Sequence, residues 1–116
     1  MSGLPADVSG PSRFVRATAY VATHEEMADA QSGEMAALHI LNTFDIPVGF
    51  VRGGNAGGAQ DQTLWSTIAN RTDLRYIVRG VEDPNPVAID LKSTIFDGGD
   101  PRQVELPTGA FTTLTI

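Results

Sequence analysis

The sequence has no cysteine and no long hydrophobic run. Without cysteine, its 116 residues cannot form a disulfide scaffold, a cysteine–zinc site, an iron–sulfur cluster or a cysteine nucleophile. No stretch approaches the roughly 18 apolar residues that are needed to cross a bilayer, so we expect a soluble protein. Residues 1–12 carry neither the basic nor the apolar region of a secretory signal.

Basic residues are also scarce. The 8 Lys and Arg residues are outnumbered by 14 Asp and Glu, which gives a formal net charge of −6. Nucleic-acid binding requires a basic face that displaces phosphate counterions, so we expect neither a nucleic-acid nor a membrane partner. A hydrophobic content of 41% is enough for one modest core, and the length fits a single domain over residues 1–116.

The composition divides the chain into four segments. They are a lead-in loop (1–11), a helical hairpin (12–44), a glycine-rich connector (49–61) and antiparallel strands (62–116). Two helices followed by an antiparallel β-meander indicate an α+β fold.

The first helix is predicted to begin at Ser12. This serine follows Pro11, and its hydroxyl can accept a hydrogen bond from an unpaired first-turn N–H, as an N-cap does. Phe14, Ala17 and Val21 then fall on one helix face.

The second helix has a candidate start in the capping-box pattern of Thr23 and Glu26. Gly33 weakens the segment, so the start stays open between residues 25 and 34. A stripe of large apolar residues at three-residue spacing gives this helix its predicted buried face: Met35, Leu38, Leu41 and Phe44. Pro47 is expected to end the helix, because a residue before proline is pushed out of the α region.

Four strands are predicted in the second half. They span Thr63–Asn70, Leu74–Gly80, Val87–Leu91 and Phe111–Ile116. Residues 70–73 (Asn-Arg-Thr-Asp) are turn formers, so the first two of these strands should form a β-hairpin.

Few residues point to chemistry on their own. Residues 53–58 are glycine-rich but match neither phosphate-loop pattern, so we interpret them as a connector. His24 and His39 lie too far apart for the H-E-x-x-H motif, which would need a histidine at Ala28, and we expect no metal site. Ser2 could act as an N-terminal nucleophile only if Met1 is removed, and small residues at this position are commonplace.

Arg13 stands out on electrostatic grounds. If the helix starts at Ser12, this arginine lies one residue inside a helix N-terminus, where the helix dipole is already positive. Such a position calls for an acidic partner or an anionic ligand, and a plainly solvated surface arginine remains the alternative.

Five segments, taken in chain order, form a more specific combination. They are residues 4–17 (LPADVSGPSRFVRA), 39–49 (HILNTFDIPVG), 61–66 (DQTLWS), 75–79 (RYIVR) and 87–92 (VAIDLK). The first resembles the motif L-P-G-D-x-S-x-x-S-R-F-x-R-A of the choloylglycine hydrolase family, which comprises bile salt hydrolases, penicillin V acylases and related linear-amide hydrolases. The resemblance covers nearly all of residues 3–107 and matches the last third of a family member. Ala6 departs from the family's usual glycine.

This resemblance implies a partial αββα sandwich of the N-terminal nucleophile hydrolases. In that family an N-terminal cysteine attacks a linear amide, its own α-amino group serves as the base, and no cofactor takes part. An arginine and an aspartate tune the thiol, and an asparagine helps to form the oxyanion hole. Of these residues the resemblance places only the arginine of S-R-F in this chain, as catalytic Arg13, whose guanidinium would favour a thiolate.

The implied role is therefore that of a C-terminal fragment or subunit of a linear-amide hydrolase, which we expect to be inactive alone. The expected partner is the missing N-terminal part of the hydrolase, or a second copy joined through an exposed sheet edge. The sequence does not decide the substrate among conjugated bile salts, penicillin V, acyl-homoserine lactones and other amides. It also does not decide whether the compartment is the bacterial cytoplasm or the periplasm. A non-catalytic structural or binding domain derived from the same scaffold is the alternative function.

Overall fold

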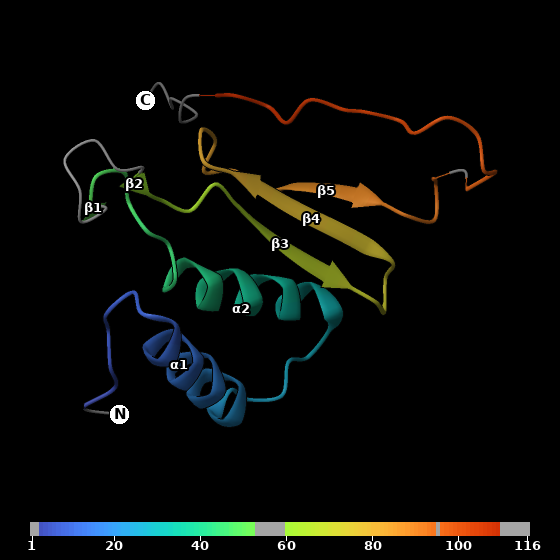
Figure 1. Ribbon diagram of the computed structural model, residues 1–116. Coiled ribbons are helices and arrows are strands. Elements are labelled where there is room, and N and C mark those ends of the chain that lie inside the picture. The colour runs from blue at the N-terminus through green and yellow to red at the C-terminus, as the bar shows by residue number, and fades with distance from the viewer. Residues whose placement is uncertain (1–2, 53–59, 95, 110–116) are drawn as a thin grey trace, which may run out of the picture. The chain divides into compact units, whose positions relative to one another are not determined.

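The computed structural model describes residues 3–52, 60–94 and 96–109. The chain forms two compact units, Met1–Thr63 and Leu64–Ile116. The first contains two helices, and the second contains a three-stranded antiparallel sheet (Figure 1). This architecture confirms the predicted α+β class. Among the described residues no helix is both long and apolar enough to span a membrane.

Helix α1 spans Gly10–Thr23, and its N-cap is Ser9. The Ser9 hydroxyl accepts a hydrogen bond from the backbone N–H of Ser12 at 3.4 Å, and Pro11 lies in the first turn, where its missing N–H costs nothing. The predicted N-cap at Ser12 is therefore wrong by three residues. Ser12 uses its own hydroxyl elsewhere, as a donor to the carboxylate of Asp7.

The apolar face of α1 is not its buried face. Phe14 is 73% exposed and Val21 is 64% exposed, whereas the two buried residues of the helix are Ser12 and Arg16. A guanidinium can be buried where carbonyl oxygens accept its hydrogen bonds, and the lead-in loop supplies such oxygens to Arg16. The spacing of apolar residues in the sequence does not show that these carbonyl oxygens are available to Arg16.

Helix α2 spans Ala30–Asn42 and begins at the N-cap Asp29, whose carboxylate accepts the backbone N–H of Ser32 at 2.7 Å. The predicted capping box at Thr23 is wrong because that threonine is the last residue of α1, and its hydroxyl donates to the Ala19 carbonyl. The helix ends at Asn42, so Pro47 is not the residue that ends it, contrary to the prediction from the sequence. Of the predicted stripe, Met35 is exposed, and the other three residues are half-buried: Leu38, Leu41 and Phe44.

Two short strands lie within the predicted glycine-rich connector, 49–61. β1 (Val51–Arg52) pairs antiparallel with β2 (Gln60–Asp61), so the ends of segment 49–61 are joined by a strand ladder rather than being plain loop. Residues 53–58, which the sequence predicts to be a connector and not a phosphate loop, lie outside the described residues. Ile46 and Thr63 join the two ends of this segment. The backbone N–H of Ile46 donates to the Thr63 hydroxyl oxygen at 2.9 Å, and the backbone N–H of Thr63 donates to the Ile46 carbonyl at 3.1 Å.

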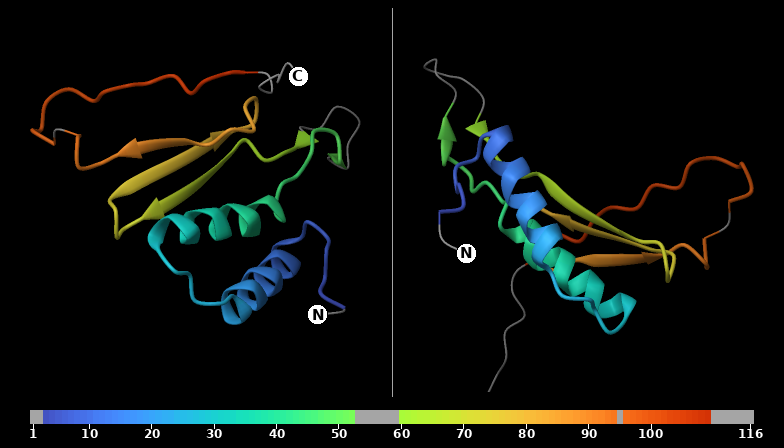
Figure 2. Two further views of the ribbon diagram at one scale, coloured as in Figure 1. Left: turned by 180° about the vertical axis from the view of Figure 1, so that it is seen from behind. Right: turned by 90° about the horizontal axis from the view of Figure 1, so that it is seen from below.

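The second unit is a meander of three strands in the order β3-β4-β5 (Figure 2). Their bounds are Trp65–Asn70, Arg75–Gly80 and Val87–Asp90. The predicted hairpin between β3 and β4 is confirmed, and Asn70 caps its turn by accepting the backbone N–H of Asp73 at 3.0 Å. The predicted final strand, 111–116, lies outside the described residues.

The register places five large apolar side chains of the sheet on one face, whereas Ile68 and Ile77 lie on the other. In an antiparallel pair, directly opposed residues share a face, and residue 65 opposes 80, 76 opposes 89 and 78 opposes 87. We call this the apolar sheet face, formed by Trp65, Tyr76, Val78, Val87 and Ile89. Trp65 is 64% exposed and Ile89 is 42% exposed. Among the described residues the buried hydrophobic one is Ile77, on the opposite face.

Candidate active site

Arg13 lies in the second turn of α1, where its backbone N–H donates to the carbonyl of the N-cap Ser9 at 3.0 Å. The side chain is half-buried, and its guanidinium carbon lies 5.8 Å from the centroid of the Phe44 ring. Since the helix starts at Gly10, Arg13 is its fourth residue and not its second. The dipole effect is confined to the first turn, so the electrostatic conflict predicted from the sequence is weaker than expected.

Phe44 is the centre of this site. It follows the C-terminal end of α2 and contacts residues 13, 16 and 20 of α1, which share one helix face. The Arg16 guanidinium carbon lies 5.1 Å from the ring centroid, and the Tyr20 ring meets it edge-on at 6.4 Å. Each cation–π contact of this kind contributes about 0.5–1 kcal/mol at exposed sites and more when desolvated. Two arginines and an aromatic ring therefore take the place of an aliphatic helix–helix contact.

Arg16 joins the lead-in loop to the helix. Its side chain is 6% exposed, and its Nη1 group donates to the carbonyl oxygens of Pro5 and Asp7, both at 2.8 Å. Its Nε is buried and has no hydrogen-bond partner in the part of the chain that the structure describes. The guanidinium is thus held at one edge by the loop and at one side by the Phe44 ring.

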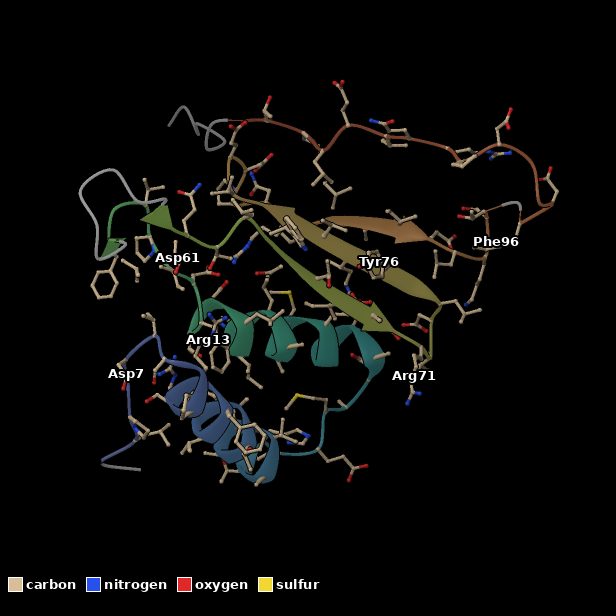
Figure 3. The ribbon with its side chains drawn as sticks, viewed as in Figure 1. Asp7, Arg13, Asp61, Arg71, Tyr76 and Phe96 are labelled. Atoms are coloured by element: carbon tan, nitrogen blue, oxygen red, sulfur yellow. The ribbon has the colours of Figure 1, made fainter. Side chains whose placement is uncertain are left out.

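Asp7 fastens the same loop to the first turn of α1 (Figure 3). Its Oδ2 accepts the hydroxyl of Ser12 at 2.6 Å, and its Oδ1 accepts the backbone N–H of Ser9 at 2.8 Å. These hydrogen bonds, the one from the Ser12 side chain first, lower the pKa of Asp7 from its ordinary value of 3.8 to about 2, and the Arg16 charge adds to the effect. The carboxylate is therefore ionised throughout the physiological range.

The titration of Asp7 tests this network. Because its pKa is lower in the folded chain, the carboxylate stabilises the fold above pH 3.8, and this stabilisation is lost as the pH falls from 3.8 through about 2. A carboxyl-carbon NMR titration should give Asp7 a midpoint near 2, and Ser12→Ala should move it upwards. Ser93→Ala, which removes an exposed hydroxyl of the second unit, should leave it in place. An Asp7 midpoint at its ordinary value in the unmodified chain would contradict the network.

The remaining candidate residues from the sequence do not converge with Arg13. His24 is exposed, and its Nδ1 lies 2.6 Å from the Val21 carbonyl oxygen; His39 is exposed in the last turn of α2. Within ranges 3–52, 60–94 and 96–109, no group of three or more histidine, aspartate and glutamate residues could hold a metal ion. Ser2 lies outside the described residues.

Sequence reasoning did not single out Arg16, Asp7 or Phe44 as parts of the site. A signal for one of them, Arg16, was present in the spacing of residues 13, 16 and 20, which puts two guanidinium groups and a ring on one helix face. A row of cationic and aromatic side chains can be the packed face of a helix when an aromatic ring lies opposite. The role of Asp7 has no such periodic signal, because it depends on the turn that the lead-in loop makes before α1.

The candidate site therefore consists of Arg13 on helix α1, with an aromatic ring and a buried second arginine beside it. A guanidinium in such a place can bind an anion or favour a thiolate, but it cannot itself attack an amide. The model of the family described as linear amide C–N hydrolases, choloylglycine hydrolase family, matches residues 1–103. The chain belongs to this family, as the resemblance of its S-R-F segment predicted.

One curated relative is an uncharacterized protein of Paramecium bursaria Chlorella virus 1. It is 30% identical over 86 residues, which cover 72% of this chain and 31% of the viral protein. The chain thus spans about a third of the length of the relative that it matches.

Proposed function

We propose that this chain supplies the C-terminal part of an enzyme that hydrolyses linear, non-peptide amides, with Arg13 as its catalytic arginine. The observation that carries the proposal is the position of Arg13 in the S-R-F segment of the matched region, with its guanidinium over the Phe44 ring. In the complete enzyme this guanidinium would face an N-terminal cysteine, which this sequence does not contain, and favour its thiolate form. Acyl amides such as conjugated bile salts and penicillin V are the proposed substrate class.

The proposed partner is the remaining part of such a hydrolase, whether it belongs to the same polypeptide or to a second one. The apolar sheet face supports this proposal, because a sheet with exposed tryptophan, tyrosine and isoleucine side chains gains stability when another layer covers it. Self-association of this chain over the same face or along a free edge strand is the competing arrangement.

The function is tested by assaying the chain alone and within a chimera. The purified chain should not hydrolyse glycocholate or penicillin V above the buffer rate, because it lacks the nucleophile. A bile salt hydrolase whose C-terminal part is replaced by this chain should hydrolyse its substrate. In that chimera Arg13→Ala should lower kcat/KM by about 100-fold or more, the usual effect of losing one group that stabilises charge in an active site.

Arg71→Ala is the matched control, because Arg71 is exposed in the β3–β4 turn. It should leave the activity of the chimera unchanged. Hydrolysis by the chain alone would refute the need for a nucleophile from outside these residues. A chimera that keeps full activity with Arg13→Ala would remove Arg13 from the catalytic machinery.

A further inference from the structure

The contacts around Phe44 suggest how an arginine with four rotatable side-chain bonds is kept in one place. A long, partly exposed arginine loses much rotamer freedom when it is ordered, so its placement requires contacts that offset this entropy. Arg13 makes no salt bridge with a carboxylate of the described residues, and its side chain is only half-buried. The contact of its guanidinium that the structure shows is the one with the Phe44 ring, at 5.8 Å.

We propose that Phe44 and Arg16 are positioning residues for Arg13. Phe44 holds the Arg13 guanidinium through its π-face, and Arg16 holds the ring and the lead-in loop in register with α1. The catalytic meaning of this arrangement rests on the proposed function, whereas the placement of Arg13 does not.

A cation–π contact suits such a task better than an ion pair. A carboxylate would neutralise Arg13 and occupy its N–H donors. An aromatic ring attracts the cation without accepting its conventional hydrogen bonds, so the five N–H donors of the guanidinium remain available to a ligand or a reacting group. The ring therefore orders Arg13 and leaves its charge and its donors free for chemistry.

Arg16 contacts the same ring and also binds the lead-in loop. Its guanidinium carbon lies 5.1 Å from the same ring, and its Nη1 is bound to two backbone carbonyls of the lead-in loop, Pro5 O and Asp7 O. Because these acceptors belong to the backbone, the loop, the helix and the ring are tied together at one buried group. Loosening Arg16 should therefore loosen the ring against which Arg13 rests.

The test is the order of the Arg13 side chain, measured by ¹⁵N relaxation of its Nε–H group in the full chain. In the unmodified chain the order parameter of Arg13 should exceed about 0.6, the value below which a group counts as flexible, and that of exposed Arg71 should fall below it. The Arg13 Hε resonance should also carry a ring-current shift. Phe44→Leu should lower the Arg13 order parameter to the value of Arg71 and remove the ring-current shift. Phe44→Trp, which keeps a π-face, should retain both the order and the shift.

Phe14→Leu is the matched control, because it removes an exposed ring next to Arg13 in the sequence and should change neither signal. Arg16→Met should lower the order parameter of Arg13 while the amide resonances of α1 remain those of a helix. Equal mobility of Arg13 and Arg71 in the unmodified chain would overturn the proposal without any variant having to fold. Retention of both Arg13 signals in folded Phe44→Leu would overturn it as well. Neither result bears on hydrolysis by the chimera, so the two proposals fail separately.

Discussion

Arg16→Met should lower the free energy of unfolding of the first unit by about 2–3 kcal/mol, although the new side chain is of similar length and apolar. The substitution removes the charge-assisted donor shared by two carbonyl oxygens and leaves those oxygens without it in a part-buried place. It also removes the buried Nε–H that has no partner among the described residues, which offsets part of the loss. The net loss of stability should still exceed that caused by replacing Arg13, the other arginine of this helix.

Arg13→Met is the control, because it removes a guanidinium from the same helix face without removing hydrogen bonds to the lead-in loop. Arg13 is half-buried, and its guanidinium contacts the Phe44 ring without the two carbonyl bonds, so its loss should cost about 1 kcal/mol or less. Urea unfolding followed by the helical circular dichroism signal measures both values. If the two variants lose equal stability, Arg16 does not tie the lead-in loop to α1.

The strands were predictable from the sequence because their signals are local. Alternating side chains between residues 65 and 80, with turn formers at 70–73, produce a hairpin through neighbouring residues alone, and the structure has it within two residues of the predicted bounds. Helix starts were less predictable. Ser9 and Ser12 are both good N-caps, and the choice between them depends on Asp7, which takes the Ser12 hydroxyl.

The buried face of α1 was not predictable from periodicity. The hydrophobic pattern favoured Phe14 and Val21, but Arg16 is buried because Pro5 and Asp7 offer it carbonyl oxygens across a turn of the chain. Such acceptors belong to backbone geometry, which side-chain patterns do not encode. The same reason explains why the sequence pointed to Arg13, through a motif, and not to the residues that place it.

Ile77→Ala should be the most damaging substitution in the second unit, with a loss of about 3 kcal/mol in the free energy of unfolding. Ile77 is 7% exposed in the middle of β4, between two paired strands. Truncating a buried isoleucine removes its transfer free energy and leaves a cavity that the sheet can close only in part. Thermal unfolding at low protein concentration, read from the amide resonances of β3–β5, gives the value.

Ile89→Ala separates burial from mere hydrophobicity. Ile89 belongs to the apolar sheet face and is 42% exposed, so in the free chain its truncation should cost less than about 1 kcal/mol. If it costs as much as Ile77→Ala, the apolar sheet face is covered in solution, and a second copy of the chain is then the available cover. In that case the loss should grow with protein concentration, because association stabilises the folded state by mass action. A small loss in the free energy of unfolding that is independent of concentration means instead that the face is exposed to solvent. This is the result expected of a surface that the rest of a hydrolase would cover.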